Sequence, residues 1–174
     1  AERMGPIIRE SIDDTMELEV EDDVCHIRGR DSHYRLNSLS PEDFPAIGTL
    51  EGEPSFRIRA ADLHEVIRRT IYAAARESTR YAINGVLWER LGKKLLLVAT
   101  DGRRLAQAST PIEASETTEL AAIAPVKAMQ LVERVLSDPE ETIAIQVTEN
   151  QLIVATARAV MASSLVEGHF PKYE

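Results

Sequence analysis

The polar run Thr100-Asp101-Gly102-Arg103-Arg104 holds the side chains of this chain that are best suited to binding a ligand. Apolar residues precede it at Leu95–Ala99, and Leu105 follows it. An Asp-Gly pair between apolar runs predicts a two-residue β-hairpin turn, because glycine readily adopts the positive φ that such a turn requires. The polar groups then lie at strand ends, where a rigid scaffold usually presents its binding residues. On pattern alone, the run is a hairpin turn.

The rest of the sequence offers little that supports catalysis. It contains no glycine-rich phosphate loop and no G-x-S-x-G nucleophile turn. The four histidines are not spaced as metal ligands are, and a single cysteine cannot complete a zinc site. These residues are His26, His33, His64, His169 and Cys25. We therefore expect no catalytic residue, no metal and no cofactor, and keep a hydrolase acting through Thr100 and Asp101 only as a third alternative.

Length and composition place the chain in a broad class. Its 174 residues allow one or two domains with a sizeable core, and no apolar run is long enough to cross a bilayer. No signal-peptide pattern is present, and one cysteine cannot form an internal disulfide, which fits a reducing cytoplasm. We expect a cytoplasmic protein with no membrane partner.

Charge is distributed unevenly along the chain. Residues 1–53 hold 14 acidic residues and five arginines, which accounts for the whole net charge of −9, so residues 54–174 are neutral overall. Residues 57–80 carry six arginines against three acids. This segregation is compatible with a basic face that binds a polyanion, and also with an ordinary solvated helix face.

One arrangement of elements recurs, in which a strand and a helix are followed by three further strands. In residues 54–110 the pattern predicts a strand at Ser55–Arg59, a helix at Ala60–Arg76, and strands near 81–90, 94–101 and 103–110. The first turn between these strands is expected at Leu91-Gly92-Lys93-Lys94. Together these elements define a β-α-β-β-β module.

The same module is predicted twice more. Residues 118–166 contain a strand at Glu119–Ala124, a helix at Pro125–Leu136, and strands near 142–147, 151–156 and 158–166. Residues 1–39 lack the leading strand and contain a helix around Arg3–Ile12 and strands near 15–21, 24–30 and 33–39. Two such modules can pack their helices over paired sheets as a two-layer α+β domain, and the Pro- and Gly-rich residues 40–53 would link two domains.

Both complete helices are amphipathic. The apolar stripes, which we expect to be core, are Leu63, Val66, Ile67, Ile71 and Ala74 in the first helix and Val126, Met129, Val132 and Leu136 in the second. The opposite faces carry Glu65, Arg68, Arg69, Tyr72 and Arg76 in the first, and Lys127, Gln130 and Arg134 in the second. These outward residues are far more basic than acidic in an acidic protein, which suggests a polyanionic partner.

Four stretches resemble the bacterial sliding clamp family, the beta subunit of DNA polymerase III. Arg80–Glu89 (RYAINGVLWE) resembles the family's R-Y-x-L-N-G-x-L-F-E, and Val98–Ala106 (VATDGRRLA) resembles its V-A-T-D-G-H-R-L-A. Leu39–Pro45 and Gly168–Tyr173 match two further family motifs. The four occur in order and at matching separations over nearly the whole chain.

The resemblance implies an α+β DNA-clamp fold, in which each domain is built from two β-α-β-β-β modules with two helices packed on antiparallel sheets. Residues 1–52 then correspond to the C-terminal half of clamp domain 1, and residues 53–174 to the complete middle domain. In the family, two three-domain subunits join head to tail as a homodimeric ring around double-stranded DNA.

The resemblance further implies a non-enzymatic processivity factor of the bacterial replicative polymerase. The expected partners are DNA, the polymerase III alpha subunit, the clamp loader and other proteins with a clamp-binding motif. Helices line the ring in the family, which makes a set of basic residues the DNA-facing groups: Arg68, Arg69, Arg76, Lys127 and Arg134. The alternative is an α+β protein-interaction module that does not bind DNA.

The family also docks a short, partly apolar partner motif in a pocket. Carried over position by position, the pocket residues are Ile83, Thr100, Gly102, Arg103, Arg104, Leu105 and Pro171. Ile83, Leu105 and Pro171 would offer an apolar floor, while Thr100 and the Gly102 backbone would offer hydrogen bonds. Arg104 could hold a carboxylate or carbonyl, and Arg103 replaces the family's usual histidine.

Overall fold

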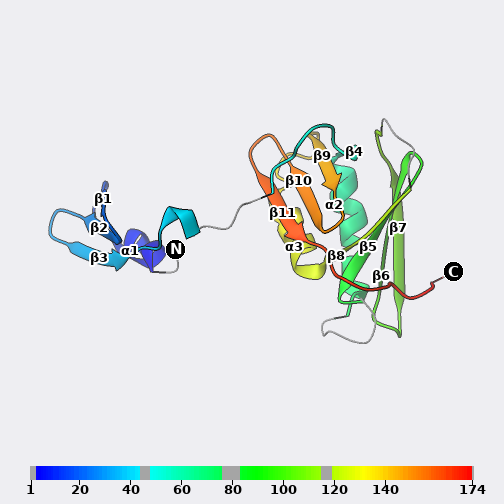
Figure 1. The fold of residues 1–174 in the computed structure, drawn as a ribbon, viewed down its shortest axis with the longest axis horizontal. Helices are drawn as coiled ribbons and strands as arrows, with labels where there is room; N and C mark the ends of the chain where they lie inside the picture. Colours follow the sequence, from blue (N-terminus) through cyan, green and yellow to red (C-terminus); the bar gives the residue numbers. More distant parts are fainter. Residues whose placement is uncertain (1–2, 44–47, 76–82, 115–118, 174) are drawn as a thin grey trace. The chain divides into compact units, whose positions relative to one another are not determined.

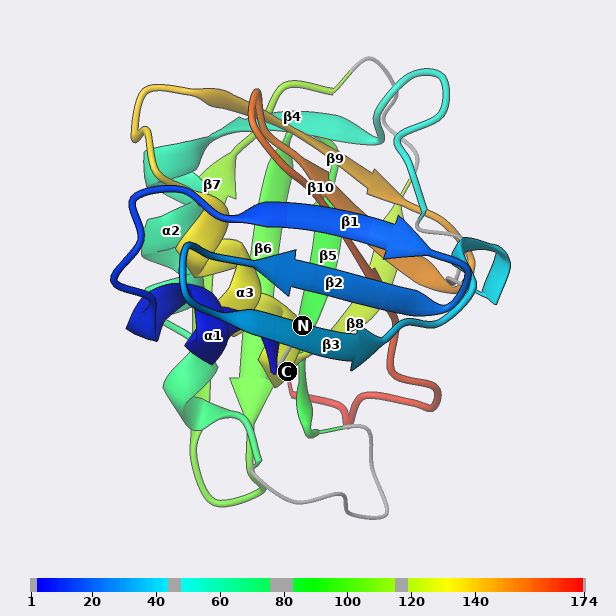
Figure 2. The same ribbon diagram turned by 90° about the vertical axis from the view of Figure 1, so that its left-hand side faces the viewer.

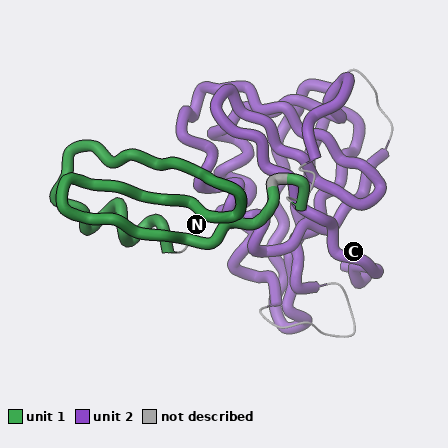
Figure 3. The backbone as a smooth tube through the Cα atoms, turned by 60° about the vertical axis from the view of Figure 1, so that its left-hand side comes forward, with its two compact units in different colours: residues 1–46 green, residues 47–174 purple. Residues whose placement is uncertain are grey.

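The strands in the described part of the chain form three antiparallel sheets. The computed structural model describes residues 3–43, 48–75, 83–114 and 119–173. Two compact units hold these sheets, residues 1–46 and 47–174 (Figure 3). One sheet belongs to the first unit and the two four-stranded sheets belong to the second.

The first unit contains one helix and one three-stranded sheet. The helix α1 spans Met4–Glu10, and the strands are β1 (Glu17–Glu21), β2 (Val24–Arg28) and β3 (His33–Asn37), drawn in blue in Figure 2. A short 3₁₀ turn follows at Pro41–Asp43. Ile27 is the only buried side chain among those described in this unit. This unit therefore has almost no core of its own.

The second unit begins with one full β-α-β-β-β module, as predicted. Its elements are β4 (Phe56–Arg59), α2 (Ala60–Arg68), a 3₁₀ turn at Ile71–Ala73, β5 (Gly85–Leu91), β6 (Lys94–Thr100) and β7 (Leu105–Pro111). Leu91 pairs with Lys94, so Gly92 and Lys93 form the two-residue turn, with Gly92 at φ 61°. Residues 81 and 82 of the predicted first strand lie outside the described residues.

The second module completes the unit (Figure 1). Its elements are β8 (Leu120–Pro125), α3 (Val126–Val135), β9 (Thr142–Val147), β10 (Gln151–Ala155) and β11 (Val160–Ser164). The prediction for β9 is confirmed at both ends. The last strand begins later than predicted, because Thr156 and Ala159 close a turn through a 2.8 Å backbone hydrogen bond.

Each module supplies its leading strand to the sheet of the other module. The two sheets have the orders β11-β10-β9-β4 and β7-β6-β5-β8, so β4 pairs with β9 and β8 pairs with β5. The sheets also adjoin at their edges, where Arg57 and Glu113 exchange backbone hydrogen bonds of 2.7 and 2.9 Å. The two modules are therefore interlocked rather than merely adjacent.

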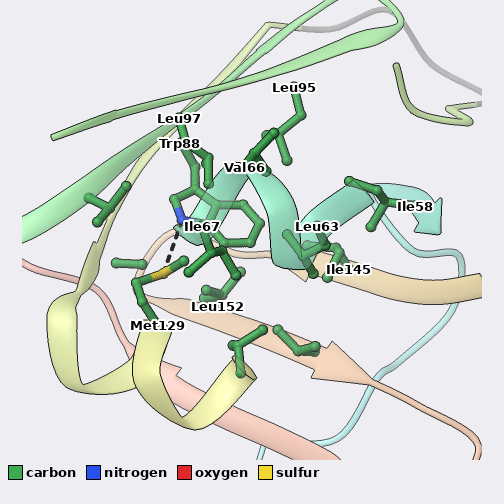
Figure 4. Packing of buried hydrophobic residues seen from close by; sticks show 14 of the residues in the cluster. Ile58, Leu63, Val66, Ile67, Trp88, Leu95, Leu97, Met129, Ile145 and Leu152 are labelled. Atoms are coloured by element: carbon green, nitrogen blue, oxygen red, sulfur yellow. Dashed lines mark hydrogen bonds between the residues drawn. The ribbon is translucent and has the colours of Figure 1, made fainter. Parts of the chain in front are cut away.

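Both helices and both sheets enclose a single apolar core. Phe56 and Ile58 of β4, Leu63 and Ile67 of α2, and Ile143 and Ile145 of β9 are all essentially inaccessible. Trp88 lies at the centre, where its indole Nε1 donates a 3.3 Å hydrogen bond to Met129 Sδ of α3 (Figure 4). Most of the predicted apolar stripes are buried here, while Ile71, Val126 and Leu136 are only partly buried.

Two sequence predictions about this unit are wrong. The helix predicted over Ala60–Arg76 ends at Arg68, because the Thr70 hydroxyl donates to the carbonyls of Val66 and Ile67 and the chain continues as a 3₁₀ turn. Asp101-Gly102 is not a two-residue turn: Thr100 pairs with Leu105, so the hairpin loop has four residues.

Candidate functional site

The loop Asp101–Arg104 is held by hydrogen bonds to the side chains of Asp101 and of Thr100, the residue just before it. Asp101 Oδ1 accepts the backbone N–H groups of Arg103 and Arg104, each at 3.0 Å, and Asp101 Oδ2 accepts Arg104 Nε at 3.1 Å. Thr100 Oγ1 donates to the Arg104 carbonyl at 2.7 Å and accepts the Gly102 N–H at 3.1 Å. Gly102 has φ 84°, the left-handed region that favours glycine. The loop is therefore held in one shape by its own hydrogen bonds.

The electrostatics of this loop do not suit acid–base catalysis. Backbone N–H groups of Arg103 and Arg104, and then the Arg104 charge, lower the pKa of the Asp101 carboxyl. A carboxylate of lowered pKa is a poor base, and the Thr100 hydroxyl donates to a carbonyl rather than to a base. The arrangement accordingly speaks against a hydrolase at Thr100 and Asp101.

The predicted pocket residues of this loop are presented at one end of the β6–β7 hairpin. Leu105 is 44% exposed, and Arg103 and Arg104 are exposed too, whereas Thr100 is buried. The Arg104 guanidinium lies 6.0 Å from the centre of the Tyr72 ring. The Gly102 N–H donates to the Thr100 hydroxyl, so these two groups are less available to hydrogen-bond a partner than the sequence suggested. Tyr72 is an exposed aromatic neighbour that was not among the predicted pocket residues.

Ile83 joins this region from the segment before β5. Its side chain is buried, and its carbonyl accepts the Ala75 N–H at 2.9 Å just after the 3₁₀ turn that holds Tyr72. Ile83 is therefore a buried side chain and not an exposed contact.

Pro171 lies over the face of the second sheet that points away from the core. On that face Leu87, Val98 and Ile123 form a small buried cluster, against which Phe170 and Tyr173 pack. The C-terminal segment, red in Figure 1, is tied to the sheet by the Val166 N–H, which donates to the Ile123 carbonyl at 2.8 Å. In register, Thr100 and Leu105 share this face with Val98.

An open cavity of about 1260 Å³ runs beneath the C-terminal segment. Pro171 lines it together with Leu87, Ile123, Phe170 and Tyr173, whereas the other predicted pocket residues do not. The structure therefore gathers Thr100, Gly102, Arg103, Arg104 and Leu105 at one loop. It places Pro171 with the Leu87 cluster on the same sheet face. In the sequence, only the aromatic residues of the Gly168–Tyr173 motif pointed to this cluster around Pro171.

The basic residues of α2 are less available than expected. Arg68 and Arg69 both form ion pairs with Glu65, at 3.1 and 2.7 Å, and together they lower the pKa of its carboxyl. The three side chains therefore carry a net charge of only +1. All three are substantially exposed, so the pairs contribute little stability. Arg76 lies outside the described residues.

The basic residues of α3 are exposed and unpaired by comparison. Lys127 and Arg134 have no ion pair within 4.0 Å among the residues that the structure describes. The two helices lie against each other in the second unit (Figure 1). Their basic residues can therefore contribute to one surface.

In the part of the chain that the structure describes, no group of three or more His, Cys, Asp or Glu side chains is arranged to hold a metal ion. None of the helices in the described ranges has the length and apolar character that a membrane crossing needs.

Known proteins match this fold and these motifs. The family model for the central domain of the DNA polymerase III beta subunit matches residues 57–172. The beta sliding clamp of Salmonella typhimurium is 33% identical over 156 residues, which cover 90% of this chain and 42% of that protein.

Solved structures match over almost the whole chain. The DNA polymerase III beta subunit of Pseudomonas aeruginosa is 29% identical, with a TM-score of 0.87 over 99% of this chain and 48% of that one. The DNA polymerase sliding clamp of Bacillus subtilis is 26% identical, with a TM-score of 0.88 over 98% of this chain and 45% of that one.

Interlocked β-α-β-β-β modules with two helices on antiparallel sheets define an α+β clamp fold, as predicted. The chain belongs to the DNA polymerase III beta subunit family, whose members are bacterial sliding clamps. It spans about half the length of the relatives it matches.

Proposed function

We propose that this chain is part of a DNA sliding clamp, the processivity factor of a bacterial replicative polymerase. Residues 1–52 would be the second half of the first clamp domain, and residues 53–174 the middle domain. The observation that carries the proposal is the TM-score of 0.88 with a sliding clamp over 98% of this chain. The complete protein would form a homodimeric ring around duplex DNA in the cytoplasm.

In this proposal the protein is a tether and not an enzyme. A ring that holds the polymerase at its template raises the effective concentration of polymerase without entering the chemistry. Contacts with DNA must be electrostatic and indifferent to sequence, because hydrogen bonds to base edges would stop the ring from sliding. Exposed Arg68, Arg69, Lys127 and Arg134 are suitable phosphate-facing groups, and Arg76 is proposed with them from its sequence position.

We further propose that the face between Leu105 and Pro171 docks a short linear motif of the polymerase alpha subunit, the clamp loader or other partners. The pocket would consist of Ile83, Thr100, Gly102, Arg103, Arg104, Leu105 and Pro171. Exposed Leu105 supplies an apolar contact beside the Arg104 cation. Buried Ile83, and the cluster under Phe170, would form the apolar floor of the pocket.

The pocket can be tested with an immobilised clamp-binding peptide. We expect the peptide to retain the unaltered chain and to lose Leu105→Asp, because a carboxylate placed on the apolar contact would have to be desolvated. Leu91→Asp is the matched control: Leu91 is similarly exposed, at 50%, but lies on β5 opposite Lys94, whereas Leu105 lies opposite Thr100 at the other end of β6. Equal retention of both variants would refute the pocket assignment.

A second candidate, a protein-interaction module with solvated helix faces, is favoured by one observation. Arg68 and Arg69 both pair with Glu65, as they would on a face that meets only solvent. In a complete ring, reversing Arg68, Arg69 and Lys127 to Glu should reduce both loading on DNA and its salt sensitivity. Unchanged loading would favour the interaction module instead.

A further inference from the structure

Two histidines of the first unit meet across the β2–β3 hairpin. His26 pairs with Arg35 and His33 pairs with Arg28, so the two histidines are diagonal neighbours on one face of the sheet. Their rings stack with centroids 5.2 Å apart and an interplanar angle of 23°. His26 Nδ1 lies 3.0 Å from His33 Nε2. Neither ring is needed for the clamp function proposed above.

The distance between these two nitrogens is that of two ligands on one metal ion. Imidazole nitrogen binds Zn²⁺ at about 2.0–2.1 Å, which puts two neighbouring nitrogens of a tetrahedral or octahedral ion about 2.8–3.4 Å apart. In the structure without metal, one ring must donate a hydrogen bond and the other must accept it. A metal ion would take one lone pair from each nitrogen, and the ring that had donated would then carry its proton on its other nitrogen.

The surroundings of the pair are acidic overall. Register places Glu17, Glu19 and Glu21 of β1 on the same face as His26, with Glu19 directly opposite it. Glu19 forms a 2.5 Å ion pair with Arg28 and so offsets the nearest arginine on β2. Arg35 opposes a bound cation, but the first unit, residues 1–46, holds 12 acidic residues against five arginines. The field over this face therefore favours a cation.

We propose that His26 and His33 form a two-histidine site for a divalent transition-metal ion such as Zn²⁺, Ni²⁺ or Cu²⁺, with water completing the coordination. Imidazole donors select these ions over Mg²⁺ and Ca²⁺, which prefer oxygen ligands. The site lies on a surface sheet, so the ion can enter directly from solvent: His33 is exposed and His26 is half-buried. The site is independent of whether the chain acts as a clamp.

Isothermal titration of the 174-residue chain, purified without a histidine tag, tests the site. We expect one Zn²⁺, Ni²⁺ or Cu²⁺ per chain, with Cu²⁺ bound most tightly, and no binding of Mg²⁺. His26→Asn and His33→Asn should each weaken binding by about tenfold or more, because each leaves one imidazole ligand. His64→Asn and His169→Asn are matched controls at the other two histidines and should retain full affinity.

Two results would overturn the proposal. One is equal metal affinity in His26→Asn, His33→Asn and the unaltered chain, which would place the ion elsewhere. The other is no saturable binding by the unaltered chain below millimolar metal, which would leave the histidines as a hydrogen-bonded pair only. Circular dichroism establishes that each variant is folded, and the electron paramagnetic resonance of bound Cu²⁺ counts the nitrogen ligands independently of affinity.

Discussion

Asp101 is the residue that shapes the tip of the β6–β7 hairpin. Its carboxylate accepts two backbone N–H groups and one arginine N–H, and all three donors belong to the same loop. Aspartate is common in turns because its side chain can replace a backbone acceptor in this way. Asp101 therefore holds Arg103 through its backbone alone and Arg104 through both its backbone and its guanidinium, while both side chains stay exposed.

We expect the Asp101 carboxyl to titrate below its ordinary pKa of 3.8, and to do so even in Arg104→Ala. The reason is that backbone N–H groups, which alanine retains, are the main cause of the lowered pKa. A carboxyl titration followed by nuclear magnetic resonance measures this directly. A return to 3.8 in Arg104→Ala would show that the arginine charge dominates instead.

The same shift fixes the sign of a pH effect on stability. Because the pKa of Asp101 is lowered in the folded state, its stabilising contribution is present above the ordinary pKa and is lost as pH falls through the lowered value. The difference in melting temperature between the unaltered chain and Asp101→Ala should be constant around neutral pH and shrink below about pH 4. A difference that persists undiminished in strong acid would contradict this account.

At the scale of elements, Glu65 controls the charge that α2 presents. Glu65 forms ion pairs with two arginines at once. Glu65→Gln removes this negative charge and should therefore raise the affinity of the chain for duplex DNA. Arg68→Glu and Arg69→Glu should lower that affinity. Each arginine that engages a phosphate should add about 0.9 to the logarithmic salt slope. Fluorescence anisotropy of a labelled duplex against salt concentration measures both quantities.

Glu149→Gln is the control for this experiment, because it makes the same charge change in the β9–β10 turn, outside the two helices. If it raises DNA affinity as much as Glu65→Gln does, net charge rather than the α2 surface governs binding.

Trp88 connects β5 of one module with α3 of the other. Trp88→Ala should reduce the free energy of unfolding by about 3–5 kcal/mol, because it leaves a large cavity in a closely packed core. The 3.3 Å hydrogen bond to Met129 would be lost with it. Leu131→Ala, at an exposed position of α3, should change stability by less than about 0.5 kcal/mol. Urea denaturation followed by circular dichroism compares the two variants.

The order of elements could be predicted from sequence because apolar periodicity reports directly on buried faces. The amphipathic stripe of Leu63, Val66 and Ile67 is an example, since all three are buried. The end of α2 could not be predicted, because a single Thr70 hydroxyl that bonds back to the helix decides it. Partners chosen by tertiary structure were also out of reach, such as Met129 for the Trp88 indole or His33 for His26 across its hairpin.

At the scale of the whole molecule, the two units differ sharply in the core they possess. Both buried apolar clusters consist of residues of the second unit, whereas the described part of the first unit buries Ile27 alone. Burial of apolar surface is the main favourable term in folding. The first unit should therefore be much the less stable of the two.

We expect this difference to appear as two unfolding transitions. Trp88 is the only tryptophan and lies in the core of the second unit, so its fluorescence should follow the second transition alone. Circular dichroism should follow both, and Ile27→Ala should shift only the first. Coincident curves from the two signals would show that the units unfold together.

The two modules exchange their leading strands, β4 and β8, and this has a consequence for cutting the second unit into pieces. Neither module can finish its own sheet, since β4 needs β9 and β8 needs β5. Pieces made by cutting the chain between β7 and β8 would each lack one sheet partner and expose half of a shared core. Mixed together, they should recognise each other and rebuild the domain by fragment complementation, while neither folds alone.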